Sequence, residues 1–124
     1  MRQNGYIKKA KEFFELAKKE IKESKKNGKQ NIAVDGCAKG YLALDLATKG
    51  LFLKKGVSKE RIPKTYRGLL YFLQTYADKD LRRIFKSVRA TLHIDGYYEQ
   101  IIEYPIIKEA FEDLEEYIKI IEKL

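Results

Sequence analysis

Apolar residues recur every three or four positions through almost the whole chain, and this period constrains the fold more than any other feature. It is the period of a helix with one buried face. No stretch of useful length alternates with the period of two that a strand requires, so we expect no sheet. The pattern predicts an all-α protein, a four- to five-helix, mainly antiparallel up-and-down bundle. Its expected core includes Leu44, Leu70, Phe85, Val88, Leu92, Leu114 and Ile118.

Glycine, proline and capping residues divide the pattern into five helices joined by short turns. The second helix, over about 30–55, is apolar on most sides, so we expect it to lie centrally. Pro63 is expected in the first turn of the third helix, where its missing N–H matters least, and Pro105 in the first turn of the last. Asp78 is the expected N-cap of the fourth helix, and Gly96 its expected end.

The length of 124 residues is that of one ordinary domain, and we expect residues 1–124 to form a single helical-bundle domain. No apolar run is long enough to span a membrane. The one cysteine, Cys37, cannot form an internal disulfide, which favours a cytoplasmic protein. Lys and Glu dominate the charged residues, a bias common in proteins of thermophiles.

The formal net charge of +8 is distributed unevenly. Residues 1–29 have a net charge of +6 and residues 54–89 of +8, whereas residues 99–124 have a net charge of −5. Either these segments complement one another within the bundle, or the basic ones form a surface for phosphates and other polyanions.

A basic ridge on the fourth helix is the most informative functional pattern. At 100° per residue, Arg82, Lys86, Arg89 and His93 fall within about a 60° arc beside the apolar stripe. Arg can grip phosphate with two hydrogen bonds, Lys adds a point charge, and His can exchange a proton near neutral pH. The alternatives are a solvated face, or pairing with acidic residues of the last helix.

Two tyrosines, Tyr97 and Tyr98, follow the ridge directly. They can stack on a base or line a pocket, or they can pack over the bundle end or line a dimer contact. Because His93 is the only histidine and Cys37 the only cysteine, we expect no metal site. We also expect no cofactor.

Two segments support a family resemblance: residues 36–45, Gly-Cys-Ala-Lys-Gly-Tyr-Leu-Ala-Leu-Asp, and residues 92–98, Leu-His-Ile-Asp-Gly-Tyr-Tyr. With the basic hairpin between them, they resemble an uncharacterised prokaryotic helical family similar to the HEPN (higher eukaryotes and prokaryotes nucleotide-binding) group. The resemblance implies a helical bundle, often dimeric, that acts as an RNase of a toxin system or as the partner of a small nucleotidyltransferase.

The catalytic signature that the resemblance implies is an Arg followed, after four to six residues, by a His. Arg89 and His93 would take those places, with three residues between them instead. We therefore expect a homodimer that binds a nucleotide, RNA or another phosphorylated partner through Arg82, Lys86, Arg89, Tyr97 and Tyr98. The alternatives are a metal-independent RNase, with Arg89 and His93 as catalytic residues, and a purely protein-binding bundle.

Overall fold

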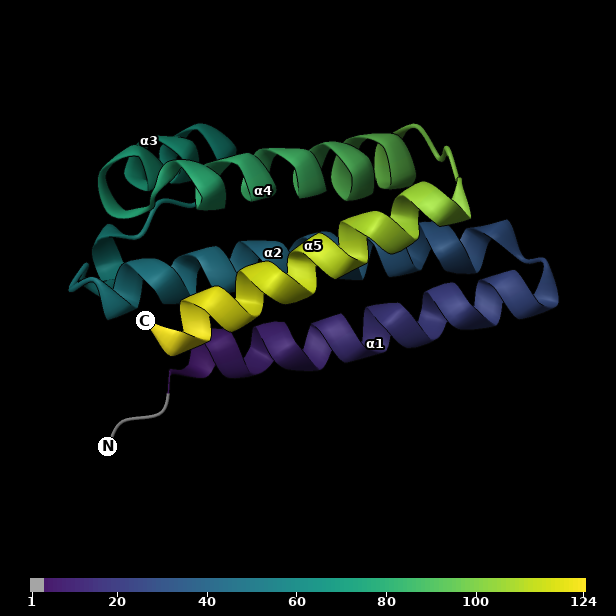
Figure 1. Cartoon of the computed structure of the whole chain (residues 1–124), viewed down its shortest axis with the longest axis horizontal. Helices are drawn as coiled ribbons and strands as arrows, with labels where there is room; N and C mark the ends of the chain where they lie inside the picture. Colours follow the sequence, from purple (N-terminus) through teal and green to yellow (C-terminus); the bar gives the residue numbers. More distant parts are fainter. Residues whose placement is uncertain (1–3) are drawn as a thin grey trace.

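A computed structural model describes residues 4–124, and every regular element in this range is a helix. In chain order the elements are α1 (Gly5–Asn27), α2 (Gln30–Lys54), the single 3-10 turn η1 (Lys59–Arg61), α3 (Tyr66–Tyr76), α4 (Lys79–Arg89), the π-helix η2 (Ala90–Tyr98) and α5 (Tyr104–Lys123). Figure 1 shows them packed as a bundle, with α5 crossing obliquely over α1 and α2. The predicted all-α helical bundle is confirmed.

An antiparallel pair formed by α1 and α2 is the most extensive helix contact. The Asn4 side chain caps the start of α1 by accepting hydrogen bonds from the backbone N–H groups of Tyr6 and Ile7. The helix ends at Gly28, whose φ of +67° is the left-handed conformation that glycine adopts without strain. The chain then reverses within two residues and begins α2.

The central position expected for α2 is confirmed, because this helix contacts α1, α3, α4, α5 and η2. Close approach requires small residues along it. A Cβ atom on Gly40 would lie 2.8 Å from Cδ1 of Leu92 and 3.0 Å from Cζ of Phe111, so only glycine lets η2 and α5 pack this closely. Leu44 is fully buried in the middle of the helix.

The expected core is largely correct. Six of its seven residues are buried: Leu44, Phe85, Val88, Leu92, Leu114 and Ile118. Leu70 is only partly buried, because its neighbours Leu69 and Leu73 occupy the inner face of α3.

Two helix boundaries differ from the sequence-based expectation. The first turn of α3 does not contain Pro63, because the helix begins at Tyr66 and the Thr65 side chain accepts a hydrogen bond from the N–H of Gly68 as its N-cap. Gly96 does not end the fourth helix, which continues to Tyr98 as η2. Asp78 and Pro105 lie at helix starts as expected.

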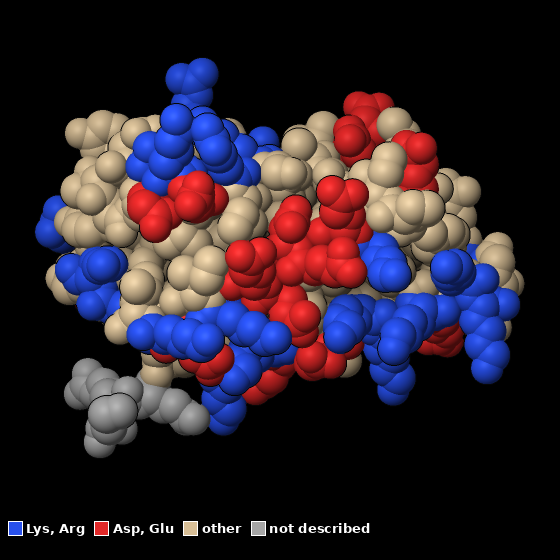
Figure 2. All heavy atoms as spheres, in the orientation of Figure 1, with Lys and Arg blue, Asp and Glu red and all other residues tan. Residues whose placement is uncertain are grey.

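Charge is segregated on the surface. Figure 2 shows acidic side chains gathered over α5, with rows of basic side chains on α1 below them and a basic group above. The opposite net charges of residues 1–29 and 99–124 therefore lie side by side on this face. An ion pair joins α1 to α5 where Lys11 Nζ lies 2.7 Å from Glu122 Oε2.

Candidate functional site

Helix α4 passes into the π-helix η2 without a break, and this junction positions the candidate site. Arg89 and Ala90 both have ordinary right-handed helical dihedrals. From Ala90 the hydrogen bonds span five residues, and the last one runs from the N–H of Glu99 to the carbonyl of Ile94 at 2.9 Å. Such wide turns are uncommon and are frequently found at functional sites. His93 lies within this π-helix, one turn beyond Arg89.

Close packing of η2 on α2 holds the π-helix in place. Gly96 is buried, and a Cβ atom there would lie only 2.6 Å from Sγ of Cys37. Leu92 is fully buried on the same side, against Gly40. The face of η2 with these residues is therefore fixed against α2, and His93 and Tyr97 lie at its margin.

Arg89 is held over an aromatic ring. Its guanidinium carbon lies 3.5 Å from the centroid of the Tyr66 ring, and that ring stacks in turn on Phe85 with the two planes 10° apart. A guanidinium over the face of an aromatic ring gains a cation–π attraction, which favours this position of the side chain. Nε of Arg89 is buried and has no hydrogen-bond partner within residues 4–124. A buried donor without an acceptor is costly, which makes this atom unusual.

His93 lies within an aromatic cluster that we define as Tyr41, His93, Tyr97 and Tyr98. Its ring stacks on Tyr41 of α2, with centroids 3.9 Å apart and planes 20° apart. The centroid of the Tyr98 ring lies 4.8 Å away in an edge-on arrangement, and the Tyr97 ring lies 6.0 Å away, nearly parallel. Tyr97 and Tyr98 keep 41% and 64% of their surface exposed, so they present ring area to solvent.

The electrostatics of the cluster favour a neutral imidazole. Burial lowers the pKa of His93 from its ordinary value, the nearby positive charge of Arg89 lowers it further, and the Asp45 carboxylate opposes the shift. Burial likewise raises the pKa of Tyr41, as does Asp45, whereas a hydrogen bond and the charge of Arg89 act in the other direction. His93 can therefore accept a proton or hydrogen bond at neutral pH.

The four residues that were expected to form one ridge on the fourth helix do not all lie in the same site. Arg89 and His93 lie together with Tyr97 and Tyr98. Arg82 instead donates a hydrogen bond from Nη1 to the carbonyl of Ala77 at 2.8 Å, at the start of its own helix. Lys86 is exposed. No ion pair joins α4 to α5 among residues 4–124.

Two site residues on other helices, Tyr41 and Tyr66, were not predicted as site residues from the sequence, and the Asp45 carboxylate of α2 acts on the same cluster. Tyr41 and Asp45 are four residues apart on α2, a spacing that places both on one helix face. Nζ of Lys49 lies 2.9 Å from a carboxylate oxygen of Asp45, an ion pair between residues four apart on the same helix. No local signal connects Tyr66 with Arg89, because only packing of α3 on α4 brings them together.

No group of three or more His, Cys, Asp or Glu side chains within residues 4–124 is placed to hold a metal ion. No helix within the same range is long and apolar enough to cross a membrane.

Comparison with known families identifies the fold. A family model described as HEPN domain matches residues 5–124, nearly the whole chain. The chain belongs to the HEPN domain family. Searches of curated proteins and of solved structures give no match. The resemblance seen in the sequence is thus confirmed at the level of the HEPN family, and the protein is a HEPN-domain helical bundle.

Proposed function

We propose that this HEPN-domain protein binds single-stranded RNA or a nucleotide at Arg89 and the aromatic cluster. The observation that supports this most is the position of Arg89: its guanidinium lies over Tyr66, its charge reaches His93, and the side chain as a whole is only partly buried. Its terminal Nη groups can donate hydrogen bonds to a phosphate oxygen. Arginine is suited to that role because its planar donors match a phosphate group.

The exposed rings of Tyr97 and Tyr98 supply the second part of the proposed interface. Every base has a flat face that stacks on an aromatic ring, which gives affinity with little sequence preference. Because these rings contact His93, a base stacked on them would lie next to the imidazole, which is close enough to Arg89 for its pKa to be lowered by that charge. The net charge of +8 adds long-range attraction for a polyanion.

Fluorescence anisotropy with a labelled single-stranded RNA tests this proposal. We expect saturable binding whose affinity falls steeply as salt rises, because each phosphate contact releases counterions. A nucleotide should compete for the same site. Absence of binding to RNA and to every common nucleotide at low salt would refute the proposal, and a purely protein-binding bundle would then be favoured.

A second candidate function is metal-independent RNA cleavage, and the lowered pKa of His93 favours it. A neutral imidazole can remove the proton of an RNA 2′-hydroxyl. The 2′-oxygen would then attack the adjacent phosphorus, and the bond to the 5′-oxygen of the next nucleotide would break. Arg89 would stabilise the negative charge on the phosphoryl oxygens, and the protonated His93 could return its proton to the departing 5′-oxygen. The products would be a cyclic phosphate and a free 5′-hydroxyl.

Ribose and 2′-deoxyribose oligonucleotides of the same sequence separate the two candidates. A nuclease would bind both but cleave only the ribose form, and a chelator would not stop it. His93→Gln would leave binding intact and reduce cleavage by orders of magnitude. If the ribose form stays uncut over many hours at saturating protein, the protein only binds.

The proposal also includes the oligomeric state, the cellular compartment and a protein partner. We infer a homodimer that works in the cytoplasm, with a nucleotidyltransferase-type protein as a further partner. The exposed Ile101 and Ile106 side chains support the dimer, and the single, buried Cys37 supports a reducing compartment.

A further inference from the structure

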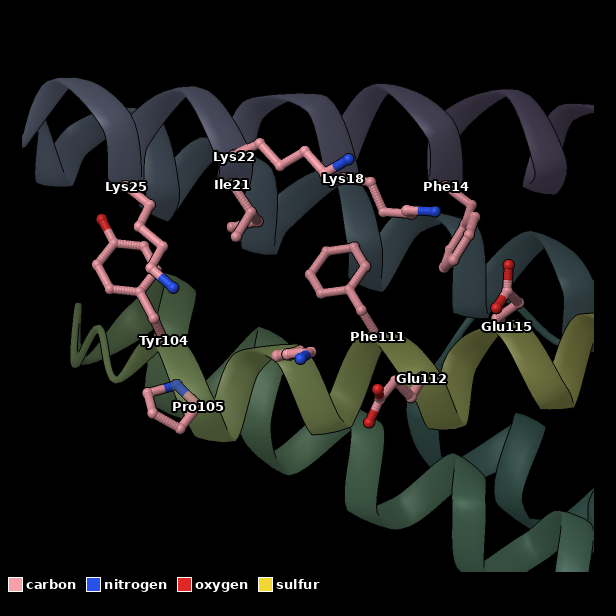
Figure 3. Close-up of a pocket in the computed structure, with 11 residues that line it drawn as sticks. Phe14, Lys18, Ile21, Lys22, Lys25, Tyr104, Pro105, Phe111, Glu112 and Glu115 are labelled. Carbon is pink, nitrogen blue, oxygen red and sulfur yellow. The ribbon is translucent and has the colours of Figure 1, made fainter.

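A groove between α1 and α5 lies away from the Arg89 site. It encloses about 680 Å³ and has an apolar floor. Figure 3 shows Phe111 pointing from α5 toward α1, between Ile21 and Phe14. Tyr104 and Lys25 lie at one end of the groove, and Glu115 lies at the other.

The oblique course of α5 produces this groove. The two helices are close near the C-terminus, where Lys11 pairs with Glu122 at 2.7 Å. They diverge toward the start of α5 (Figure 1), where only the Tyr104 hydroxyl reaches across, 2.7 Å from Oγ of Ser24. Side chains therefore bridge both ends, while the middle is left open over the floor.

Lysines line the groove along its length, with Lys25 at the wide end and Lys18 near Phe14. Lys18, Lys22 and Lys25 follow one another at spacings of four and three, so they share one face of α1, and Lys108 faces them from α5. None of these four forms an ion pair within residues 4–124. Lys18 lies over the Phe14 ring, with Nζ 5.3 Å from its centroid, which holds this ammonium group above the apolar floor.

We propose that this groove binds a free single-chain anionic amphiphile, that is, an alkyl or aryl chain that ends in a carboxylate or phosphate. The anionic end lies beside Lys25 at the wide end, with Lys22 and Lys108 also lining the groove, and the chain lies along Ile21, Phe111 and Phe14 toward the narrow end. The two carboxylates of Glu112 and Glu115 lie at that end and repel a second negative charge. The orientation of the ligand is thus set by the charges on the two ends of the groove.

The narrowness of the floor argues for a single chain over a partner helix. Phe14 and Phe111 expose only 5% and 6% of their surface, so the accessible apolar strip is thin. A docked helix needs a broad apolar groove for anchors on successive turns. The enclosed volume instead falls within the range of about 300–1,000 Å³ that is usual for small-molecule sites.

Isothermal titration with dodecanoate, dodecyl phosphate and dodecanol, all below their micellar concentrations, tests the proposal. We expect both anions to bind and the alcohol to bind at least about tenfold more weakly, because it lacks the charge that the lysines attract. The double variant Lys18→Glu with Lys25→Glu should weaken dodecanoate binding by about tenfold or more. Its fold is checked by circular dichroism.

The matched control is Lys19→Glu with Lys26→Glu. It makes the same change in net charge, one position further along α1, at exposed lysines outside the groove. This control should bind dodecanoate as the native protein does. Equal losses in the two double variants, equal binding of the alcohol, or binding to phosphatidylglycerol vesicles without binding of free dodecanoate would each overturn the proposal.

Discussion

His93 and Tyr41 stack face to face, with ring centroids 3.9 Å apart, although they come from different helices. This contact joins η2 to α2 beside Arg89 and shelters one face of the imidazole. It explains why burial is the largest influence on the pKa of His93, ahead of the charges of Arg89 and Asp45. The packing of η2 on α2 therefore influences the protonation of His93 in the proposed site.

The pKa of the only histidine can be measured directly by NMR, and we expect it to lie below the ordinary value of 6.5. Arg89→Gln removes a neighbouring positive charge, so it should raise the pKa. Asp45→Asn removes a negative charge and should lower it. An unchanged pKa in both variants would show that neither group lies close enough to act on the imidazole.

The same shift makes stability depend on pH. Because the folded-state pKa of His93 is lowered, the unfolded chain binds the proton more readily, and this contribution to stability is complete above the unfolded value of about 6.5. It should decline as pH falls below that value and through the folded pKa. The free energy of unfolding, measured by urea melts between neutral and mildly acidic pH, should therefore fall more with decreasing pH for the native protein than for His93→Gln. Parallel pH profiles would contradict the assignment.

Leu44→Ala tests the central position of α2. Leu44 is fully buried, so the truncation should lower the free energy of unfolding by about 2–5 kcal/mol. Leu16, which is half-exposed on α1, supplies the control, and Leu16→Ala should cost far less. Denaturant melts that give equal losses for the two variants would show that Leu44 is not part of the core.

Gly96→Ala tests the packing that holds the π-helix on α2. A methyl group there would lie 2.6 Å from Sγ of Cys37, so the variant should be destabilised by about 1–3 kcal/mol, the usual cost of overpacking. Cys37→Ala removes the sulfur, and the double variant should lose less than the sum of the two single losses. If the loss of unfolding free energy in the double variant equals the sum of the two single losses, the two residues are not in contact.

A dimer is expected in solution, and two exposed isoleucines that precede and begin α5 suggest where it forms. Ile101 and Ile106 each keep 49% of their surface exposed. Light scattering should give twice the mass of the chain at micromolar concentrations. Ile101→Glu with Ile106→Glu should give the monomer mass, whereas Leu16→Glu on α1 should leave the dimer intact. A monomer mass for the native protein would exclude this assembly.

The sequence predicted α1, α3, α4 and α5 well because each has an amphipathic period, and it predicted the central position of α2 because that helix is apolar on most sides. The neighbouring positions of Arg89 and His93 also followed from their spacing on one helix. The π-helix had no local signal, because the packing of Gly96 on Cys37 accompanies it and depends on tertiary structure. The partners of the two site residues, Tyr66 and Tyr41, lie on other helices, so helical spacing could not reveal them.

For Arg82, in contrast, the position predicted from helical spacing was misleading. Helical spacing placed it with Arg89 on one ridge, but its guanidinium turns to the carbonyl of Ala77 before its own helix begins. A spacing argument gives the direction in which a side chain leaves the backbone, and it says nothing of a competing acceptor within reach. Long side chains such as arginine are therefore the least predictable members of a proposed site.

The most direct test of the central claim is the affinity of Arg89→Gln for a labelled single-stranded RNA, compared with that of Arg83→Gln. Arg83 is exposed on the same helix, so its variant loses the same charge without touching Tyr66 or His93. We predict that Arg89→Gln weakens binding by about tenfold or more, as expected for a lost charge-assisted contact to phosphate, and that Arg83→Gln changes it by less than about twofold. Equal affinities of the two variants, with both proteins folded, would contradict the proposed role of Arg89.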